Sequence, residues 1–477
     1  MSWFLIIVSF IFFLLRLPSL FEPYWYGDEG IYQVMGMAIN NGRLLYKDIW
    51  DNKPPLLYLL YAILNSDQFA ARVVSLVFGL LSVLVFFFLT KKLFVKRKVY
   101  FFTTAIFALM LALPLLEGNI ANAENFMILP ILIAALLISN IKYQISNIKL
   151  FYAGLLLGIA FLFKVVAIFD FAAFLVFLFF LEFPTNKKLQ DKKYIILKLQ
   201  QLTPFFLGFF IPIGITALFF LLNSAFGDFV RAILFSNVGY VGYGNKFIIP
   251  HGLLLLKGIF LNFSIVYIFK IRQMLSPITI FILIWFSFSL FNAFFAERPY
   301  THYLLTLLPS FILMIGLIIW EKSYKKTLIV FFTVAFILIL KNFNFYGKTI
   351  TYYQNFALFL AGQKNVSSYR AYFDKKTPID YEISLFIKSK VGKKDSIFIW
   401  GNNAQVYKLV GSLPPGKYIV AYHMIDYKDG LTNTKDAIAK IKPRFIVIMP
   451  DQKPVPFPLI RYSKRISIDN VSIYERF

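Results

Sequence analysis

The chain has 477 residues, of which 59% are hydrophobic and 15% are charged, and it contains no cysteine. Soluble globular proteins usually carry about a quarter charged residues, so this composition and a mean hydropathy of +0.69 predict an integral membrane protein. The lack of cysteine excludes disulfides and cysteine-based metal sites. The net charge of +25 could indicate nucleic-acid binding, but the basic residues cluster between apolar runs, where they set membrane topology and meet anionic lipid.

About eleven apolar segments have the length or density of membrane-spanning helices. The first has no basic residue before it and no small-residue cleavage site, so we interpret it as a retained helix rather than a signal peptide. Two short segments flank Lys164, which predicts two helices meeting at this lysine, because a charge deep in a single span is costly. In chain order, the predicted spans are residues 3–21, 68–90, 99–116, 121–139, 150–164, 167–182, 202–222, 252–269, 277–295, 303–320 and 327–341.

The charged residues divide unequally between the two ends of these predicted helices. Lys and Arg are frequent in the loops 91–98, 187–198 and 322–326, on the side that also holds the N-terminus. The positive-inside rule places these loops in the cytoplasm. Most acidic residues fall in the opposite loops, so we expect any chemistry at the outer face of the cell membrane.

Near residue 345 the composition becomes polar and charged. We therefore predict a transmembrane domain at 1–345, with its first outer loop at 22–67, and a soluble domain at 346–477. An odd number of spans places this second domain outside the cytoplasm. Predicted strands and helices alternate in it, which indicates a small parallel or mixed α/β sheet. The strands are expected at 396–400, 418–421 and 445–449, and the helices at 383–391, 404–410 and 435–440.

The first outer loop has the most informative set of polar residues. Asp28 and Glu29 follow the first span at the membrane boundary, where partial desolvation makes a carboxylate a better base. Residues 31–39 predict a short interfacial helix. Further on, Lys53 precedes two prolines that rigidify the chain, and its ammonium group is a suitable point charge for a phosphate.

This loop resembles the first-loop signature of the GT-C membrane glycosyltransferases. The nearest groups are the protein O-mannosyltransferases and the lipid A aminoarabinose transferases, with their bacterial relatives. Their pattern is an Asp–Glu pair, a tyrosine three residues on, a glycine-containing turn, Tyr-x-Asp and Lys-Pro-Pro. All these elements are present here in the same order, a coincidence that an ordinary polar loop would rarely produce: Asp28, Glu29, Tyr32, Gly42, Tyr46, Asp48, Lys53, Pro54 and Pro55.

Three further segments extend the resemblance. Glu124 lies where the family carries a second acidic motif, although a carboxylate at a helix N-terminus would also explain it. Lys164 matches a helix that ends in lysine at the active-site face, with a snorkelling lysine as the alternative. Arg298 and His302 match a late pattern of basic and aromatic residues followed by proline, with an interfacial histidine as the alternative. His251 and His423 have no partner spacing, and we predict structural roles for both.

The resemblance implies a GT-C fold and an inverting transfer from a polyprenyl-phosphate-linked sugar to a hydroxyl acceptor on a lipid, polysaccharide or protein. It implies Asp28 as general base, with Glu29 orienting the acceptor or sugar or supporting a divalent ion. No metal ligand is assigned, because relatives differ in metal use. The other expected roles are binding of the donor phosphate by Lys53, Arg298, Lys164 and His302, and binding of the acceptor or sugar by Tyr32, Tyr46, Asp48 and Glu124.

Two other classes of protein fit the sequence less well than an enzyme. A transporter or a flippase for lipid-linked sugars would need inverted repeats or charges along a path through the bilayer. The polar groups gather instead at the outer face. A structural or assembly protein gives no reason for an Asp–Glu pair followed by Lys-Pro-Pro. The sequence therefore favours an enzyme with a one-sided site.

Overall fold

The computed structural model describes residues 2–139, 145–182, 192–237, 246–392, 395–450, 452 and 454–477. Part of the basic loop predicted at 187–198 lies outside these residues. The chain divides into two compact units. The membrane unit consists of residues 1–17, 74–219 and 234–349, and the loop–tail unit consists of residues 18–73, 220–233 and 350–477.

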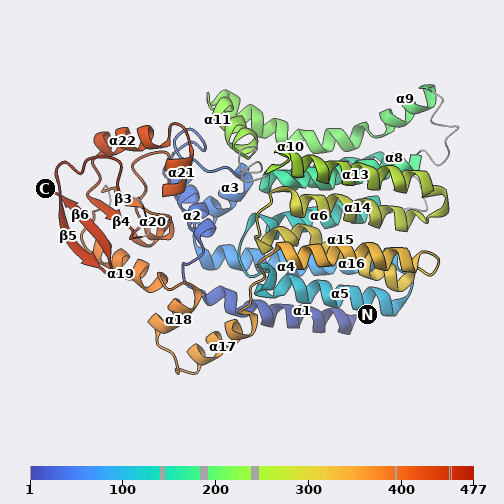
Figure 1. Ribbon diagram of the computed structural model, residues 1–477, viewed down its shortest axis with the longest axis horizontal. Coiled ribbons are helices and arrows are strands. Elements are labelled where there is room, and N and C mark those ends of the chain that lie inside the picture. Colours follow the sequence, from blue (N-terminus) through green and yellow to red (C-terminus); the bar gives the residue numbers. More distant parts are fainter. Residues whose placement is uncertain are drawn as a thin grey trace. The chain divides into compact units, whose positions relative to one another are not determined.

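The membrane unit is built from helices that lie alongside one another (Figure 1). Helices α4 (Gln68–Leu93) and α10 (Thr203–Leu222) have most of their residues in this unit. Its other elements are α1 (Ser2–Arg16), α5 (Arg97–Ala112), η2 (Pro114–Leu116), α6 (Ala123–Ile138), α7 (Asn147–Phe163), η3 (Val165–Ala167), α8 (Ile168–Glu182), α9 (Lys192–Gln201), β1 (Lys246–Phe247), β2 (Ile249–Pro250), α13 (Gly252–Ile271), η6 (Arg272–Met274), α14 (Pro277–Phe295), η7 (Thr301–Tyr303), α15 (Leu304–Trp320) and α16 (Lys325–Asn342).

Each predicted span coincides with a helix, so the polytopic helical architecture is confirmed. The two helices predicted around Lys164 are also confirmed, because α7 ends at Phe163 and Lys164 has the extended dihedrals φ −155° and ψ 128°. Within the described residues, six helices are long and apolar enough to cross a membrane by themselves: Trp3–Phe21, Gln68–Leu93, Thr203–Leu222, Gly252–Met274, Pro277–Phe295 and Thr301–Trp320.

Glycines allow α7 and α10 to approach closely in the membrane unit. A Cβ atom added at Gly154 would lie 2.0 Å from the carbonyl oxygen of Phe205, and one added at Gly208 would lie 2.1 Å from that of Phe151. Small residues are what let helix backbones approach in a membrane, where lipid provides no hydrophobic drive between helices. The α7–α10 interface therefore depends on the absence of side chains at these positions.

We predict that Gly208→Ala lowers the free energy of unfolding by about 1–3 kcal/mol, since its methyl group would overlap the α7 backbone. Gly214→Ala in the same helix is the matched control, because nothing lies within 4 Å of its Cβ position. Replacing that glycine should be neutral or slightly stabilising through helix propensity. Thermal unfolding in detergent measures both variants, and equal effects would contradict the close approach.

The loop–tail unit combines the first outer loop with the C-terminal part of the chain. In chain order, its elements are η1 (Leu17–Phe21), α2 (Gly27–Asn40), α3 (Pro55–Ile63), α11 (Phe226–Val230), the π-helix η5 (Arg231–Phe235), α17 (Thr349–Leu360), α18 (Val366–Phe373), α19 (Thr377–Lys388), β3 (Ile397–Trp400), α20 (Gln405–Val410), α21 (Ala421–Asp426), α22 (Gly430–Ile441), β4 (Phe445–Ile448), β5 (Tyr462–Ile468) and β6 (Val471–Arg476).

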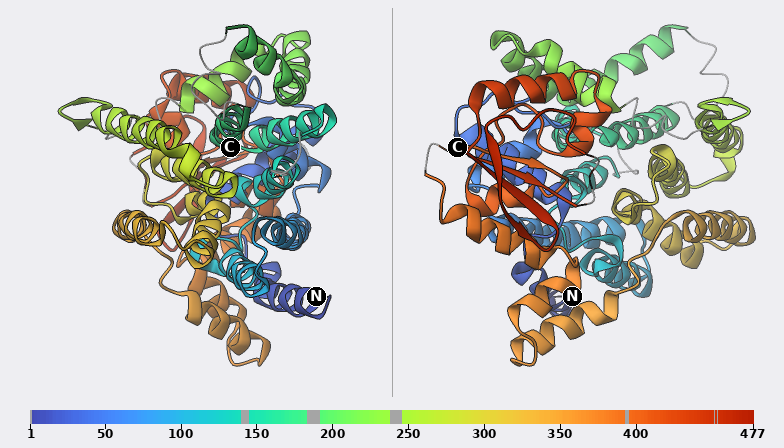
Figure 2. Two further views of the ribbon diagram at one scale, coloured as in Figure 1. Left: turned by 90° about the vertical axis from the view of Figure 1, so that its right-hand side faces the viewer. Right: turned by 60° about the vertical axis from the view of Figure 1, so that its left-hand side comes forward.

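The predicted α/β tail is confirmed as a four-stranded mixed sheet in the order β3-β4-β6-β5, drawn in orange to red in Figure 2. Strands β3 and β4 are parallel, with Ile397 opposite Phe445, and β6 is antiparallel to both β4 and β5. The strand predicted at 418–421 is wrong. Tyr418 forms only an isolated bridge with Trp50, and α21 begins at Ala421.

The β5–β6 hairpin was not predicted, although its turn is visible in the sequence. Asp469 and Asn470 connect the strands with φ values of 42° and 69°. Two consecutive residues with positive φ make the turn that suits a two-residue hairpin, and Asp and Asn tolerate this conformation. The exposed, charged residues of β5 hide its strand character, because they lack the usual alternation of apolar and polar side chains.

Candidate functional site

Asp28 lies in the first turn of α2, where its carboxylate is 37% exposed. A negative charge is favourable there because the helix dipole places partial positive charge at the N-terminus. The Lys53 ammonium is 3.3 Å from Asp28 Oδ2, and the Tyr32 hydroxyl donates a hydrogen bond of 3.1 Å to the same oxygen. The structure thus brings together three of the residues predicted from the first-loop pattern.

A second carboxylate, Asp51, lies behind Lys53 and is 1% exposed. Its Oδ2 is 3.7 Å from the Lys53 ammonium and accepts a 2.6 Å hydrogen bond from the Tyr58 hydroxyl. Burial, with the nearby charge of Asp51 as the next cause, holds the pKa of Tyr58 well above its usual value, so the hydroxyl keeps its proton as a donor. Sequence reasoning had not assigned a role to Asp51 or Tyr58.

Tyr46 fixes the loop that presents Lys53. It has no exposed surface and adopts a left-handed φ of 68°, which is uncommon for a bulky residue and is maintained by its surroundings. Its hydroxyl donates to the Lys53 carbonyl oxygen at 2.8 Å, and its ring packs 5.3 Å from that of Phe220. Pro54 and Pro55 then begin α3, as proline favours the start of a helix.

The other predicted acceptor-binding residues of this loop differ in exposure. Tyr32 is 1% exposed, and its contacts include Asp28 and Lys53, whose ammonium lies 4.9 Å from its ring centre. Asp48 is exposed and accepts a 2.8 Å hydrogen bond from the Leu44 backbone, which closes a turn. Of Tyr32, Tyr46 and Asp48, only Asp48 presents its side chain to the surface.

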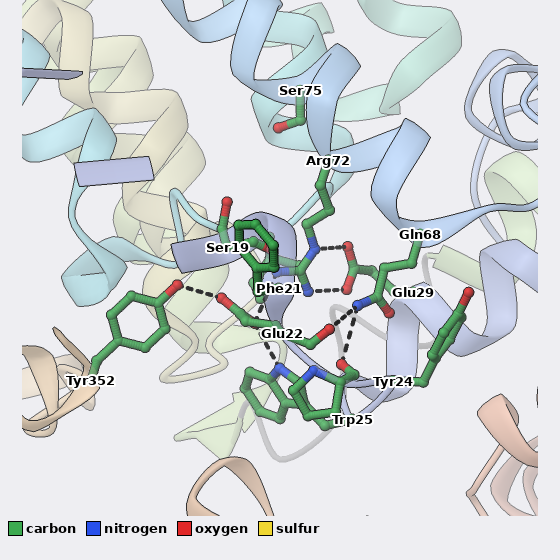
Figure 3. Close-up of polar contacts among 12 residues, drawn as sticks. Ser19, Phe21, Glu22, Tyr24, Trp25, Glu29, Gln68, Arg72, Ser75 and Tyr352 are labelled. Atoms are coloured by element: carbon green, nitrogen blue, oxygen red, sulfur yellow. Dashed lines mark hydrogen bonds and ion pairs between the residues drawn. The ribbon is translucent and has the colours of Figure 1, made fainter. Parts of the chain in front are cut away.

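A buried arginine organises the start of the loop (Figure 3). Arg72, near the start of α4, has no exposed surface. Its Nε donates to Glu29 Oε1 at 2.8 Å, and one terminal nitrogen lies 2.8 Å from Glu22 Oε2. A second terminal nitrogen donates to Glu29 Oε2 at 2.5 Å, which makes that pair bidentate. A guanidinium and a carboxylate fit each other best through two parallel hydrogen bonds of this kind. Arg72, Glu22 and Glu29 together form a charge triad.

Further donors complete the triad in Figure 3. The Tyr352 hydroxyl of α17 donates to Glu22 Oε1 at 2.6 Å, and the Trp25 indole donates to Glu22 Oε2 at 2.7 Å. The Gln68 amide donates to the Glu22 carbonyl at 2.9 Å. Glu29 is therefore committed to Arg72, while its neighbour Asp28 faces Lys53.

We predict that Arg72→Met lowers the free energy of unfolding by about 3–5 kcal/mol, because it leaves two buried carboxylates without their cation. Adding Glu22→Gln and Glu29→Gln should recover part of this loss, since no buried charge then stays unpaired. Arg465→Met, at a residue whose side chain is 58% exposed, is the control. If purified Arg72→Met has the same unfolding temperature as the wild type, the role of the triad is contradicted.

The C-terminal residues pack directly against the first loop within the loop–tail unit. The Trp50 backbone donates to the Lys417 carbonyl at 2.9 Å, and the Trp50 ring lies 4.2 Å from that of Tyr427. The Arg43 guanidinium donates to the carbonyl oxygens of Pro414 and Gly416 at 2.9 and 3.3 Å. These contacts hold the loop that carries Asp51 and Lys53 against the tail.

His423, for which the sequence predicts a structural role, is buried beside the loop carboxylate Asp51. Its Nε2 is 3.6 Å from Asp51 Oδ1, and its ring lies 5.0 Å from that of Trp50 in an edge-to-face contact. Burial lowers the pKa of His423 to about 4, although the charge of Asp51 opposes this shift. The imidazole is therefore neutral at neutral pH. No signal in the sequence pairs residue 423 with residue 51.

A buried carboxylate on α19 holds Gln405, whose backbone packs against α2. Asp380, 2% exposed, accepts hydrogen bonds from the Asn403 amide at 2.8 Å and from the Gln405 amide at 2.7 Å. The Gln405 backbone packs so closely on Gly30 that a Cβ atom there would lie 2.7 Å from the Gln405 nitrogen. Burial raises the pKa of Asp380 to about 7 against the effect of these hydrogen bonds.

We predict that Asp380 makes the protein less stable as pH rises from about 4 to 7. In this window the folded protein keeps the proton that the unfolded chain has lost, which costs up to about 4 kcal/mol. Asp380→Asn should remove this decline and raise stability at pH 8, whereas Glu382→Gln, exposed on the same helix, should not. Thermal unfolding measured against pH tests this, and an unchanged slope in Asp380→Asn would refute it.

The membrane unit contains a second polar cluster. Glu124, 2% exposed in the first turn of α6, pairs with the Lys164 ammonium. His302 lies between two carboxylates, with Nδ1 3.1 Å from Glu117 Oε2 and Nε2 3.8 Å from Glu124 Oε1. The Lys164 ammonium also lies 4.6 Å from the Tyr303 ring centre. Three predicted residues, Glu124, Lys164 and His302, are thus brought together.

Glu117 is the member of this cluster to which the sequence assigned no role. It adopts a left-handed φ of 58° at the end of η2 and accepts a 2.9 Å hydrogen bond from the Thr301 hydroxyl. Such strain in a non-glycine residue persists only where surrounding contacts maintain it. Arg298, the remaining predicted phosphate ligand, is half-buried in the segment that leads to η7. Among the described residues, no group of three or more His, Asp or Glu side chains is arranged to hold a metal ion.

Residues 53–209 match the family model described as dolichyl-phosphate-mannose-protein mannosyltransferase. Over these residues, which include Lys53, Pro54 and Pro55 of the first-loop pattern, the match confirms the predicted resemblance to membrane glycosyltransferases. Among curated proteins, none is significantly similar in sequence to this chain.

Two solved structures are also similar to this chain. The apo oligosaccharyltransferase of Archaeoglobus fulgidus is 14% identical, with a TM-score of 0.48, over 93% of this chain and 69% of that one. ArnT from Cupriavidus metallidurans, bound to undecaprenyl phosphate, is 13% identical, with a TM-score of 0.46, over 98% of this chain and 97% of that one.

Proposed function

We propose that this protein transfers a sugar from a polyprenyl-phosphate donor to a hydroxyl group of a lipid, glycan or protein, at the extracytoplasmic face of the cell membrane. The observation that carries the proposal is the setting of Asp28, a partly exposed carboxylate bonded by Tyr32 and Lys53. The family match of residues 53–209 supports the donor class, since that family is described by a dolichyl-phosphate-linked sugar.

In the proposed reaction Asp28 is the general base. Its carboxylate takes the proton of the acceptor hydroxyl while the oxygen attacks the anomeric carbon, and the bond from that carbon to the phosphate oxygen breaks with inversion. The Lys53 cation keeps Asp28 ionised and ready to accept the proton. The Tyr32 hydrogen bond fixes the orientation of the carboxylate.

The leaving lipid phosphate gains negative charge and requires cations. We assign this role to Lys53, Lys164, Arg298 and His302. In the membrane unit Glu124 contacts both Lys164 and His302, so it orients the two cations rather than binding the sugar alone. Glu117 contacts the other nitrogen of His302, so both ring nitrogens face carboxylates.

The remaining loop residues fall into two roles in this proposal. Asp48, which is exposed, is assigned to the acceptor or the sugar. Tyr46 and Glu29, which are buried, act by positioning: Tyr46 holds the Lys53 backbone, and Glu29 fixes the first turn of α2 through Arg72.

We predict that Asp28→Asn lowers the rate of sugar transfer by about 10²–10⁴-fold, the usual contribution of a general base. Asparagine matches aspartate in size and retains hydrogen bonding, so folding and donor binding should be preserved. The rate is measured with purified protein and a radiolabelled polyprenyl-phosphate sugar. Asp469→Asn, in the exposed β5–β6 turn, is the matched control and should keep the wild-type rate.

Three results would overturn the assignment of Asp28. Asp28→Asn that transfers sugar at a near wild-type rate excludes a general base at this position. Restoration of the variant by added divalent cation would indicate a metal ligand instead. Loss of stability with unchanged chemistry would reduce Asp28 to a charge at a helix terminus, worth about 0.3–1 kcal/mol.

A further inference from the structure

Helix α17 (Thr349–Leu360) has no charged residue, although it belongs to the charged C-terminal part of the chain. The helices α19 and α22 of the same part are also 12 residues long, and each contains three charged residues. A helix that meets water on its outer side usually carries charged or polar residues there. The composition of α17 therefore predicts a less polar neighbour for its outer side.

The inner side of α17 packs within the loop–tail unit. The Tyr352 hydroxyl donates to Glu22 Oε1 at 2.6 Å, and the Phe356 ring lies 5.6 Å from the Phe21 ring. Phe21 is the last residue of the apolar helix Trp3–Phe21, which is long enough to cross a membrane. The contact between the two phenylalanine rings therefore places the middle of α17 beside the end of a membrane span.

The covalent chain also keeps the start of α17 close to the membrane. Helix α16 coincides with the last predicted span and ends at Asn342, six residues before α17 begins. The Asn344 backbone donates to the Pro299 carbonyl at 3.0 Å, directly before the apolar helix Thr301–Trp320, another candidate span. The five residues that follow Asn344 reach at most about 18 Å when fully extended. The start of α17 therefore stays near the ends of two spans.

The outer side of α17 is mainly apolar. Ile350, Leu358 and Leu360 are 74%, 37% and 65% exposed, and the exposed Thr351 and Gln354 are its polar members. Scattered apolar residues on a surface need no explanation, but these residues lie on an uncharged helix that the chain holds near the ends of membrane spans. At that position the medium that suits exposed apolar side chains is the boundary between lipid headgroups and acyl chains.

We propose that α17 is an interfacial helix that lies flat on the lipid bilayer and buries Ile350, Leu358 and Leu360 in its surface. A helix of this kind inserts its apolar side roughly 5–10 Å into the boundary between headgroups and acyl chains. Lys348, which directly precedes the helix, lies where a lysine can extend to the phosphates of lipid headgroups. The occupant of the outer side of α17 is therefore the lipid surface in which the neighbouring spans end.

The lipid contact gives the charge triad of the first loop a second anchor. Tyr352 of α17 donates to Glu22, and Glu22 pairs with Arg72. Lipid on the outer side and buried charges on the inner side thus hold the same helix. The loop that carries Asp28 is then fixed by the membrane surface as well as by the protein. The lipid contact itself does not depend on sugar transfer.

The test uses the lack of cysteine in the chain, because a single introduced cysteine can be labelled without background. Ile350→Cys and Leu360→Cys, at the two ends of α17, are labelled with the fluorophore NBD in the full chain, reconstituted in phosphatidylcholine nanodiscs. Quenching is measured with lipids that carry a doxyl group near the headgroup or at the end of the acyl chain, and with aqueous iodide. We expect doxyl near the headgroup to quench both labels about threefold or more beyond a label in water, and iodide to quench them less.

The two labels also report how the helix lies in the bilayer surface. A flat helix places both labels at the same depth, whereas an upright helix separates them by roughly 15 Å. We therefore expect the ratio of quenching by the two doxyl lipids to be equal at Ile350→Cys and Leu360→Cys.

Ile460→Cys is the matched control, because Ile460 is 73% exposed and Ile350 is 74% exposed. Ile460 lies next to the C-terminus, since the Phe477 backbone donates to the Arg461 carbonyl at 3.2 Å. Within the loop–tail unit, Figures 1 and 2 show the C-terminus away from α17. The label at this control position should be quenched by iodide and not by the doxyl lipids.

Labels on α17 that iodide quenches as strongly as the Ile460→Cys label, without quenching by doxyl lipid, overturn the inference in favour of a helix that faces water. Labels that neither quencher reaches overturn it as well, because protein, such as a second copy of the chain, then covers α17. Different depths for the two labels exclude a helix that lies flat. Thermal unfolding verifies that each variant is folded, and Gln354→Cys, exposed on the same helix, replaces one that is not.

Discussion

The buried Arg72 guanidinium is the interaction on which the loop–tail unit depends most. It neutralises Glu22 and Glu29 in a place without solvent, where an unpaired charge would cost several kcal/mol. Because Glu22 also accepts from Tyr352, the same charge triad joins α4, the entry to α2 and α17. The first turn of α2 is thereby fixed. Of its two acidic residues, Glu29 binds Arg72 and Asp28 binds Lys53.

Burial divides the acidic residues of the first loop into those that hold the site and those that can meet a substrate. Glu29 and Asp51 are nearly inaccessible and are compensated by an arginine, a lysine and a tyrosine hydroxyl. Asp28 keeps more than a third of its surface exposed. The same arrangement recurs in the membrane unit, where buried Glu124 holds Lys164 and His302. In both units a buried carboxylate contacts the ammonium group of a lysine.

The two units differ in what stabilises them. The helices of the membrane unit approach through glycines and aromatic contacts, such as Gly208 against α7 and Phe171 stacked 4.0 Å from Phe209. The loop–tail unit relies on charge and hydrogen-bond networks that include the buried carboxylates Glu22 and Asp380.

The sequence by itself determined the membrane architecture, the break at Lys164, the α/β character of the tail and the first-loop pattern from Asp28 to Pro55. These features depend on local composition, periodicity and spacing, which involve residues close to one another in the sequence. Only the tertiary structure decided that Glu29 belongs to Arg72, that Asp51 supports Lys53, and that the tail packs on the first loop through His423. Asp51 and Lys53 are neighbours in the chain, but Glu29 and Arg72 are about forty positions apart, and Asp51 and His423 are several hundred positions apart. Their contacts arise from the folding of the whole unit, and no local pattern in the chain encodes which distant side chain will neutralise a buried charge.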